Sequence, residues 1–141
     1  MADNQIGGVL DPTRDLVMSG SIRCLGSLGY SSGAGARVTE LVSRGESVTI
    51  NALSGAITTN TASLTAEASA VMRVFNSFVE IGDVPILAQR SGGNGTDTAV
   101  YVSAVANGYF DVTTANNNPA GVSAETGAII INFAIIKAVS Q

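Results

Sequence analysis

The chain has 141 residues, 45% of them hydrophobic and 13% charged, and its 11 acidic and 7 basic residues give a formal net charge of −4. The lack of histidine and the single cysteine, Cys24, exclude the commonest general base, histidine-ligated metal sites and any intrachain disulfide. The scattered basic residues, and the absence of an apolar run of roughly 18 residues, argue against nucleic acid and against a membrane as partners.

Residues 1–36 are rich in glycine and show no sustained helical or strand periodicity. Glycine at this density leaves the backbone too free to hold a regular element by itself. The segment nevertheless contains more aliphatic residues than a purely solvating tail, which would carry more charge. We predict an extended arm that orders on another surface, and a tail without a role is the alternative. The residues expected to contact that surface are Ile6, Val9, Leu10, Leu16, Val17, Met18 and Ile22.

After the arm, the pattern changes to short β-type runs separated by turn residues. Residues 38–43 and 46–51, joined at Arg44 and Gly45, predict a hairpin. A further short strand is expected at 56–59.

The segment 64–81 is compatible with both helical and strand periods. We predict a strand at 69–80, because β-branched and aromatic residues dominate the second half although Ala, Glu and Met favour a helix. Residues 84–90 predict the next strand, which Pro85 restricts to a strand start or a sheet edge because proline lacks a backbone donor. Residues 91–97 are expected to form a loop.

The clearest local signal is a hairpin between residues 98–106 and 109–114. Asn107 and Gly108 are the residues preferred in a type I′ turn, in which both central residues have a positive φ. Short strands separated by turns predict an all-β fold, an antiparallel sandwich or jelly roll, over residues 37–141.

The last predicted strand, residues 127–140, is apolar on both faces, and Asn132 is its only strongly polar residue before Lys137. Strand alternation places Ile129, Ile131, Phe133 and Ile135 on one face, and Ile130, Ala134, Ile136 and Ala138 on the other. A sandwich of this length has one interior, so a second cover must come from the arm or from another subunit. We predict that the first four residues form an oligomer interface, and cover by the protein's own arm is the alternative.

Few side chains suggest a catalytic or metal-binding site. The string from Gly29 to Gly33 matches a serine-hydrolase nucleophile elbow, but no histidine is present to accept the serine proton. The acids Asp83, Asp97, Asp111, Glu80 and Glu125 show no spacing that would form a catalytic pair. A calcium site from Asp97, Asp111 and the carbonyls of residues 116–118 is conceivable but lacks EF-hand spacing. We therefore expect no enzyme, and no catalytic, metal or cofactor-binding residues.

Three motifs carry a resemblance to a known group of proteins. They are a threonine-rich opening (Thr49, Asn51, Gly55, Ile57, Thr58, Thr59), a run from Phe75 to Phe78, and a terminal pattern (Ile131, Phe133, Ile135, Ile136, Lys137). Together they resemble small structural proteins of tailed-phage virions, of the capsid decoration (cement) type. The resemblance covers roughly two-thirds of the chain and leaves residues 1–47 outside it.

The resemblance implies a β-sandwich on the capsid exterior that forms a homotrimer and binds the major capsid protein. It implies no catalytic residues. Charged residues are about half as frequent as in typical soluble domains, which also favours a protein whose surfaces meet other proteins. The alternative is a head or tail fibre module that binds a host glycan through the loops at 91–97 and 115–121.

Overall fold

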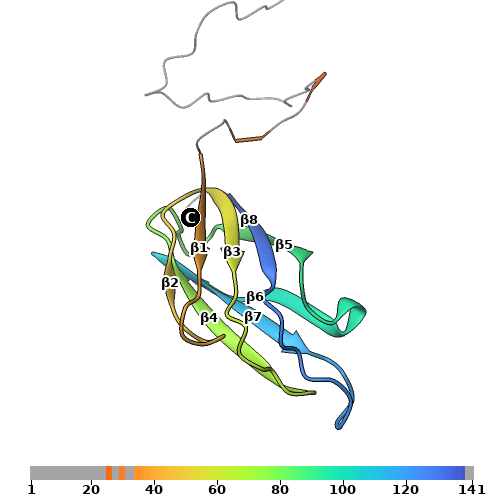
Figure 1. The fold of residues 1–141 in the computed structure, drawn as a ribbon. Coiled ribbons are helices and arrows are strands. Elements are labelled where there is room, and N and C mark those ends of the chain that lie inside the picture. Colours follow the sequence, from red (N-terminus) through yellow and green to blue (C-terminus); the bar gives the residue numbers. More distant parts are fainter. Residues whose placement is uncertain (1–24, 27–28, 31–33, 139–141) are drawn as a thin grey trace, which may run out of the picture.

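A computed structural model describes residues 25–26, 29–30 and 34–138, and the chain there is built almost entirely of β-strands (Figure 1). The strands are β1 (Gly35–Thr39), β2 (Val48–Thr49), β3 (Ser54–Thr58), β4 (Ser69–Phe75), β5 (Val84–Ser91), β6 (Thr98–Ala106), β7 (Tyr109–Asn116) and β8 (Ile130–Ile136). A single turn of 3₁₀-helix, η1 (Gly95–Asp97), precedes β6. The first strand begins two residues before the predicted start of the sandwich.

The strands form two four-stranded sheets, ordered β1-β3-β8-β5 and β2-β4-β7-β6, which we call the β8 sheet and the β7 sheet. The two sheets pack as a sandwich around one hydrophobic core (Figure 1). β1 pairs with β3, and β2 with β4, in parallel, whereas the other neighbours are antiparallel. The predicted all-β sandwich is confirmed, but its sheets are mixed rather than wholly antiparallel.

The hairpin predicted within residues 38–51 does not form, because β1 joins the β8 sheet and β2 joins the β7 sheet. The connection between them crosses from one sheet to the other. The Glu46 carboxylate accepts the backbone N–H groups of Leu41 and Val42, at 2.8 Å each. Arg44, expected in the turn of this hairpin, is buried. Contacts distant in sequence therefore replace the local pairing that the pattern indicated.

The strand predicted over 69–80 ends at Phe75, because Asn76 begins a turn. The Asn76 side chain donates from Nδ2 to the carbonyl of Ala52 at 2.7 Å, and its Oδ1 accepts the N–H of Phe78 at 3.0 Å. This buried amide provides hydrogen-bond partners for backbone groups of the turn and links the end of β4 to the segment before β3.

β6 and β7 form the predicted hairpin, but its turn is not type I′. Gly108 has a φ of +84°, whereas Asn107 keeps a negative φ, which is the φ pattern of a type II turn. Asn107 Oδ1 accepts the N–H of Ile81 at 2.9 Å, and the Gly108 N–H donates to the carbonyl of Val79 at 2.8 Å. The turn is therefore bonded to the loop after β4, and these contacts select its conformation.

Alternate side chains of the strands fill the space between the sheets. Phe110 of β7 and Phe133 of β8 meet there with ring centroids 5.8 Å apart. Gly55 of β3 lies beneath Phe133, and a Cβ at this position would clash with the carbonyl of Ala36 and lie 2.9 Å from Phe133 Cε1. Glycine is therefore required where these two strands and the ring approach closely.

Candidate functional site

The four residues predicted to form an oligomer interface lie inside the sandwich. Ile129, Ile131, Phe133 and Ile135 are 0–4% exposed in the single chain and belong to its core. Their side chains are covered by the facing β7 sheet, so they offer no surface to a second copy. The interface assignment is therefore corrected. The face of β8 that is left for a partner is the opposite one.

An aliphatic patch lies on the outer face of the β8 sheet, formed by Val84, Ile86, Ala134 and Ile136. In the strand register, Val84 of β5 is opposite Ile136 of β8, and Ile86 is opposite Ala134. Val84, Ile86 and Ile136 are 52%, 48% and 52% exposed. β5 is the edge strand of this sheet, as Pro85 predicted. The patch is therefore a continuous apolar surface held on two paired strands.

A cluster of charges fixes the chain directly after β8. Lys137 Nζ donates to Asp83 Oδ2 at 2.6 Å, to the Phe78 carbonyl at 2.8 Å and to Glu80 Oε2 at 3.3 Å, while the Ala138 N–H donates to Asp83 Oδ1 at 3.1 Å. Burial opposes ionisation of Asp83, but these hydrogen bonds and the lysine charge hold the pKa of its carboxyl below the usual range. The hydrogen bond to Asp83 is the main reason that the pKa of Lys137 is raised. The single lysine of the chain therefore stabilises the end of the patch.

The outer face of the β7 sheet is aromatic and carries its own ion pair. Arg73 of β4 makes two hydrogen bonds to Asp111 of β7, at 2.9 and 3.0 Å, and these raise the pKa of the arginine. The guanidinium carbon lies 3.9 Å from the ring centroid of Tyr109, and Phe75 meets the same ring edge to face. Val71 is half-exposed beside them. The arginine on this face is therefore already neutralised and stacked.

A buried ion pair closes one end of the sandwich. Arg44 Nη1 donates to Glu125 Oε1 at 2.8 Å, Nη2 donates to the carbonyl of Gly127 at 2.6 Å, and Nε donates to the carbonyl of Ala62. The hydroxyl of Thr98 donates to Glu125 Oε2 at 2.5 Å. Both charged side chains are almost fully buried. The pair therefore joins three loops that lie far apart in the sequence, and nothing in the local pattern around Arg44 indicated it.

Glu40 lies near this pair and is also buried. Its Oε2 accepts the N–H of Asn60 at 3.1 Å, and its Oε1 has no hydrogen-bond partner among the described residues. Burial raises the pKa of Glu40 to about 7, although the Asn60 hydrogen bond and the charge of Arg44 act in the opposite direction. This carboxyl therefore changes charge near neutral pH.

Among the acids considered for catalysis or calcium, Asp83 and Glu80 lie close together at Lys137, and the others lie apart from them. Asp111, Glu125, Asp83 and Glu80 each pair with one of the basic residues described above. Asp97 lies in η1, where its carbonyl accepts the N–H of Asn117 at 2.7 Å. In the described part of the chain, no three acidic or cysteine side chains are grouped closely enough to hold a metal ion.

The arm residues predicted to contact a partner, from Ile6 to Ile22, lie outside the described residues, as does Ser31 of the rejected elbow string. Tyr30 is described, and its hydroxyl donates to the carbonyl of Ile135. This contact places Tyr30 beside Ile135, next to Ile136 of the aliphatic patch.

Two further residues of the motifs that suggested a family also have structural roles. Asn51 Oδ1 accepts the N–H of Ser77 at 2.9 Å, and the hydroxyl of Thr59 accepts the N–H of Ile129 at 2.9 Å. Each side chain links connections that are distant in sequence, so these residues shape the sandwich rather than a site.

Comparison of the chain with protein-family models, with curated proteins and with solved structures gave no match. None of the described residues forms a helix long and apolar enough to cross a bilayer.

Proposed function

We propose that the chain is a non-enzymatic structural protein of a phage virion, a decoration (cement) protein that stabilises the capsid exterior by bridging major capsid subunits. The aliphatic patch is the observation that supports this proposal. The solvent-facing side of a sheet in a sandwich normally carries polar side chains. A contiguous exposed apolar surface on that side marks a protein interface. The low charge content of the chain and the resemblance of its motifs point in the same direction.

The patch and the arm supply two separate contacts in this proposal. The patch joins copies of the chain into a homotrimer, and covering each half-exposed isoleucine contributes roughly 1 kcal/mol. The arm, predicted as residues 1–36, contacts the major capsid protein with the part that precedes β1. Because the copies of one oligomer bind together, weak contacts by each arm add to a strong attachment.

The molar mass in solution tests the patch. We expect light scattering of the wild-type chain to give about three times the 14.2 kDa of one chain. The double variant Ile86→Glu, Ile136→Glu should return the mass to that of one chain, since it places charges within the patch. Val71→Glu is the matched control, because Val71 is equally exposed on the other sheet. A wild-type chain that stays monomeric at high micromolar concentration would contradict the proposal.

Deletion of residues 1–30 tests the arm. The shortened chain should keep the mass of the oligomer but lose binding to shells of the major capsid protein, measured by co-sedimentation. Full binding by the shortened chain would show that the arm is not the attachment.

A second candidate is a fibre module that binds a host glycan. It is favoured by the meeting of the loops at 91–97 and 115–121, where the Asn117 N–H reaches the Asp97 carbonyl. Neither loop carries an aromatic side chain on which a sugar ring could stack. A glycan array probed with the full chain decides this candidate, and the absence of any ligand would remove it.

A further inference from the structure

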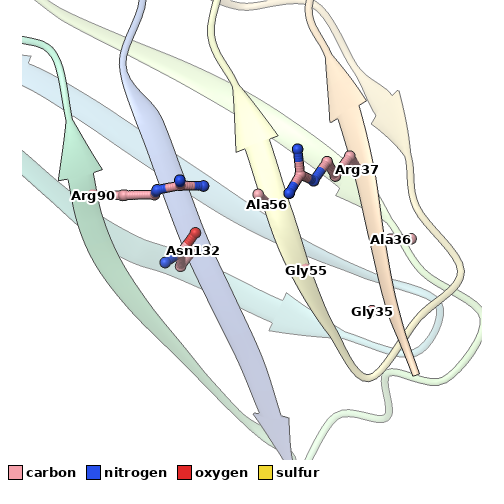
Figure 2. Close-up of a pocket in the computed structure, with 7 residues that line it drawn as sticks. All are labelled: Gly35, Ala36, Arg37, Gly55, Ala56, Arg90 and Asn132. Carbon is pink, nitrogen blue, oxygen red and sulfur yellow. The ribbon is translucent and has the colours of Figure 1, made fainter. Parts of the chain in front are cut away.

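A hollow of about 330 Å³ opens on the outer face of the β8 sheet, beside the aliphatic patch (Figure 2). Its floor is formed by small residues, among them Gly35 of the edge strand β1 and Ala56 of β3, which leave space between the larger side chains around them. Its polar lining comes from Arg37 of β1, Arg90 of β5 and Asn132 of β8. Figure 2 shows both guanidinium groups turned inward over the sheet, toward each other, with Asn132 between the two strands that carry them.

The strand register explains how these side chains meet. Arg37 is opposite Ala56, Ala56 is opposite Asn132, and Asn132 is opposite Ala88. This row across the sheet therefore has Arg37 at one end and Asn132 within it, and its other two residues are alanines. Asn132 is the single strongly polar residue in the apolar strand, and packing does not require it, since it is exposed.

A backbone irregularity supplies the second arginine. The pairing of β5 with β8 shifts between Gln89 and Ser91, so Arg90 has no partner in the ladder. A bulge of this kind bends the strand and redirects the side chain that it carries. Arg90 thereby lies over β8 next to Asn132 (Figure 2).

Neither arginine is neutralised within the described part of the chain. Its salt bridges involve Arg44, Arg73 and Lys137, and none involves Arg37 or Arg90. Both remain exposed, with their donors directed into the hollow. Two guanidinium forks form a donor set that matches a planar carboxylate, and Asn132 adds a polar side chain to the lining beside them.

We propose that this hollow binds the carboxylate of an aspartate or glutamate side chain on a protein that covers the face. The carboxylate site rests on the geometry above, and the protein source of the carboxylate rests on the proposed function. Asn132 and Ala134 lie two residues apart on the same face of β8, so the hollow and the aliphatic patch form one surface. A partner that fits both carries an acidic residue next to aliphatic ones. An extended polyphosphate is disfavoured, because the chain has a net charge of −4.

The arginine Nε–Hε signals in ¹⁵N–¹H spectra of the full-length chain test the site. The probes are acetyl-Val-Glu-Val-amide, the matched acetyl-Val-Gln-Val-amide, N-acetylneuraminate and inorganic phosphate. We expect saturable shifts of Arg37 and Arg90 with the glutamate peptide and none with the glutamine peptide. Arg37→Ala and Arg90→Ala should each weaken binding by about tenfold or more, and Arg73→Ala, on the other sheet, should leave it unchanged.

The titration is run on the wild-type chain and on Ile136→Ser, which interrupts the aliphatic patch and leaves the hollow intact. Binding by either chain supports the carboxylate site, whatever the oligomeric state. A failure of the carboxylate site can therefore be distinguished from a failure of the proposed function. No saturable shift in either chain would overturn the site. Tighter binding of phosphate would overturn the choice of a carboxylate, and tighter binding of N-acetylneuraminate would overturn the protein source.

Discussion

The two outer faces of the sandwich carry arginines in opposite states. On the β7 sheet, Arg73 is directly opposite Asp111 in the strand register, and its guanidinium is both paired and stacked on Tyr109. On the β8 sheet, Arg37 lies in a row with alanine and asparagine, and Arg90 has no partner in the ladder, so the register supplies neither arginine with a carboxylate. An arginine that the register pairs with an acid stabilises its own sheet. An arginine that it leaves without one is available to another molecule.

The end of the sandwich adds a third state, in which the pair is fully buried. Arg44→Ala should produce the largest loss of stability, about 3–5 kcal/mol in the free energy of unfolding, because it leaves Glu125 buried without a cation. Urea unfolding measures this loss, with Arg37→Ala as the exposed control. A loss below about 1 kcal/mol would show that the buried end does not hold the loops together. The double variant Arg44→Met, Glu125→Leu should recover part of the loss, since it removes both charges.

The carboxyl of Glu40 next to that pair predicts a dependence on pH. Its pKa of about 7 in the folded chain lies above its ordinary value of 4.5, so the folded chain holds the proton more tightly. This contribution to stability is complete below pH 4.5 and is lost as the pH rises through 7. After allowance for solvent screening, we expect the unfolding free energy to fall by roughly 1–2 kcal/mol over that interval.

Glu40→Gln should flatten the profile and make the chain more stable than wild type at pH 8, because the amide keeps an acceptor for Asn60 without a charge. Urea midpoints from pH 4 to pH 9 measure the effect. Identical profiles for the two chains would contradict the raised pKa.

Asp111→Asn would make the β7 sheet resemble the β8 sheet by removing the carboxylate beside Arg73. We expect a smaller loss of thermal stability than for Arg44→Ala, because the Arg73 side chain is partly exposed. The Nε–Hε signal of Arg73 should then respond to the glutamate peptide, whereas we expect no response in the wild type, where Asp111 occupies the guanidinium. An unchanged melting temperature together with an unresponsive Arg73 would show that its ion pair contributes nothing.

The smallest effect is expected from the arginines of the hollow. Arg37→Ala and Arg90→Ala should each change the unfolding free energy by no more than about 0.5 kcal/mol, since exposed side chains without partners contribute little. Urea unfolding provides the value. A loss above about 1 kcal/mol for either variant would assign that arginine to the fold rather than to binding.

Several elements could be predicted from neighbouring residues alone. The β6–β7 hairpin depends on the turn residues between its strands. The edge position of β5 depends on the missing backbone donor of Pro85, and the period-2 pattern of β8 depends on strand alternation. These are local properties, and a sequence displays them directly. The short strand-like runs separated by turn residues likewise predicted the all-β fold.

Contacts between distant residues decided the rest. The pairing of β1 with β3, the side of β8 that faces the core, the burial of Arg44 and the φ of Asn107 each depend on a partner 19 or more positions away in the chain or on the opposite sheet. The hollow depends on three strands that meet only in the sheet and on a bulge that moves Arg90. A linear pattern records which faces of a strand are apolar, but it does not record which face the second sheet covers, because that choice is made by the packing of the whole sandwich.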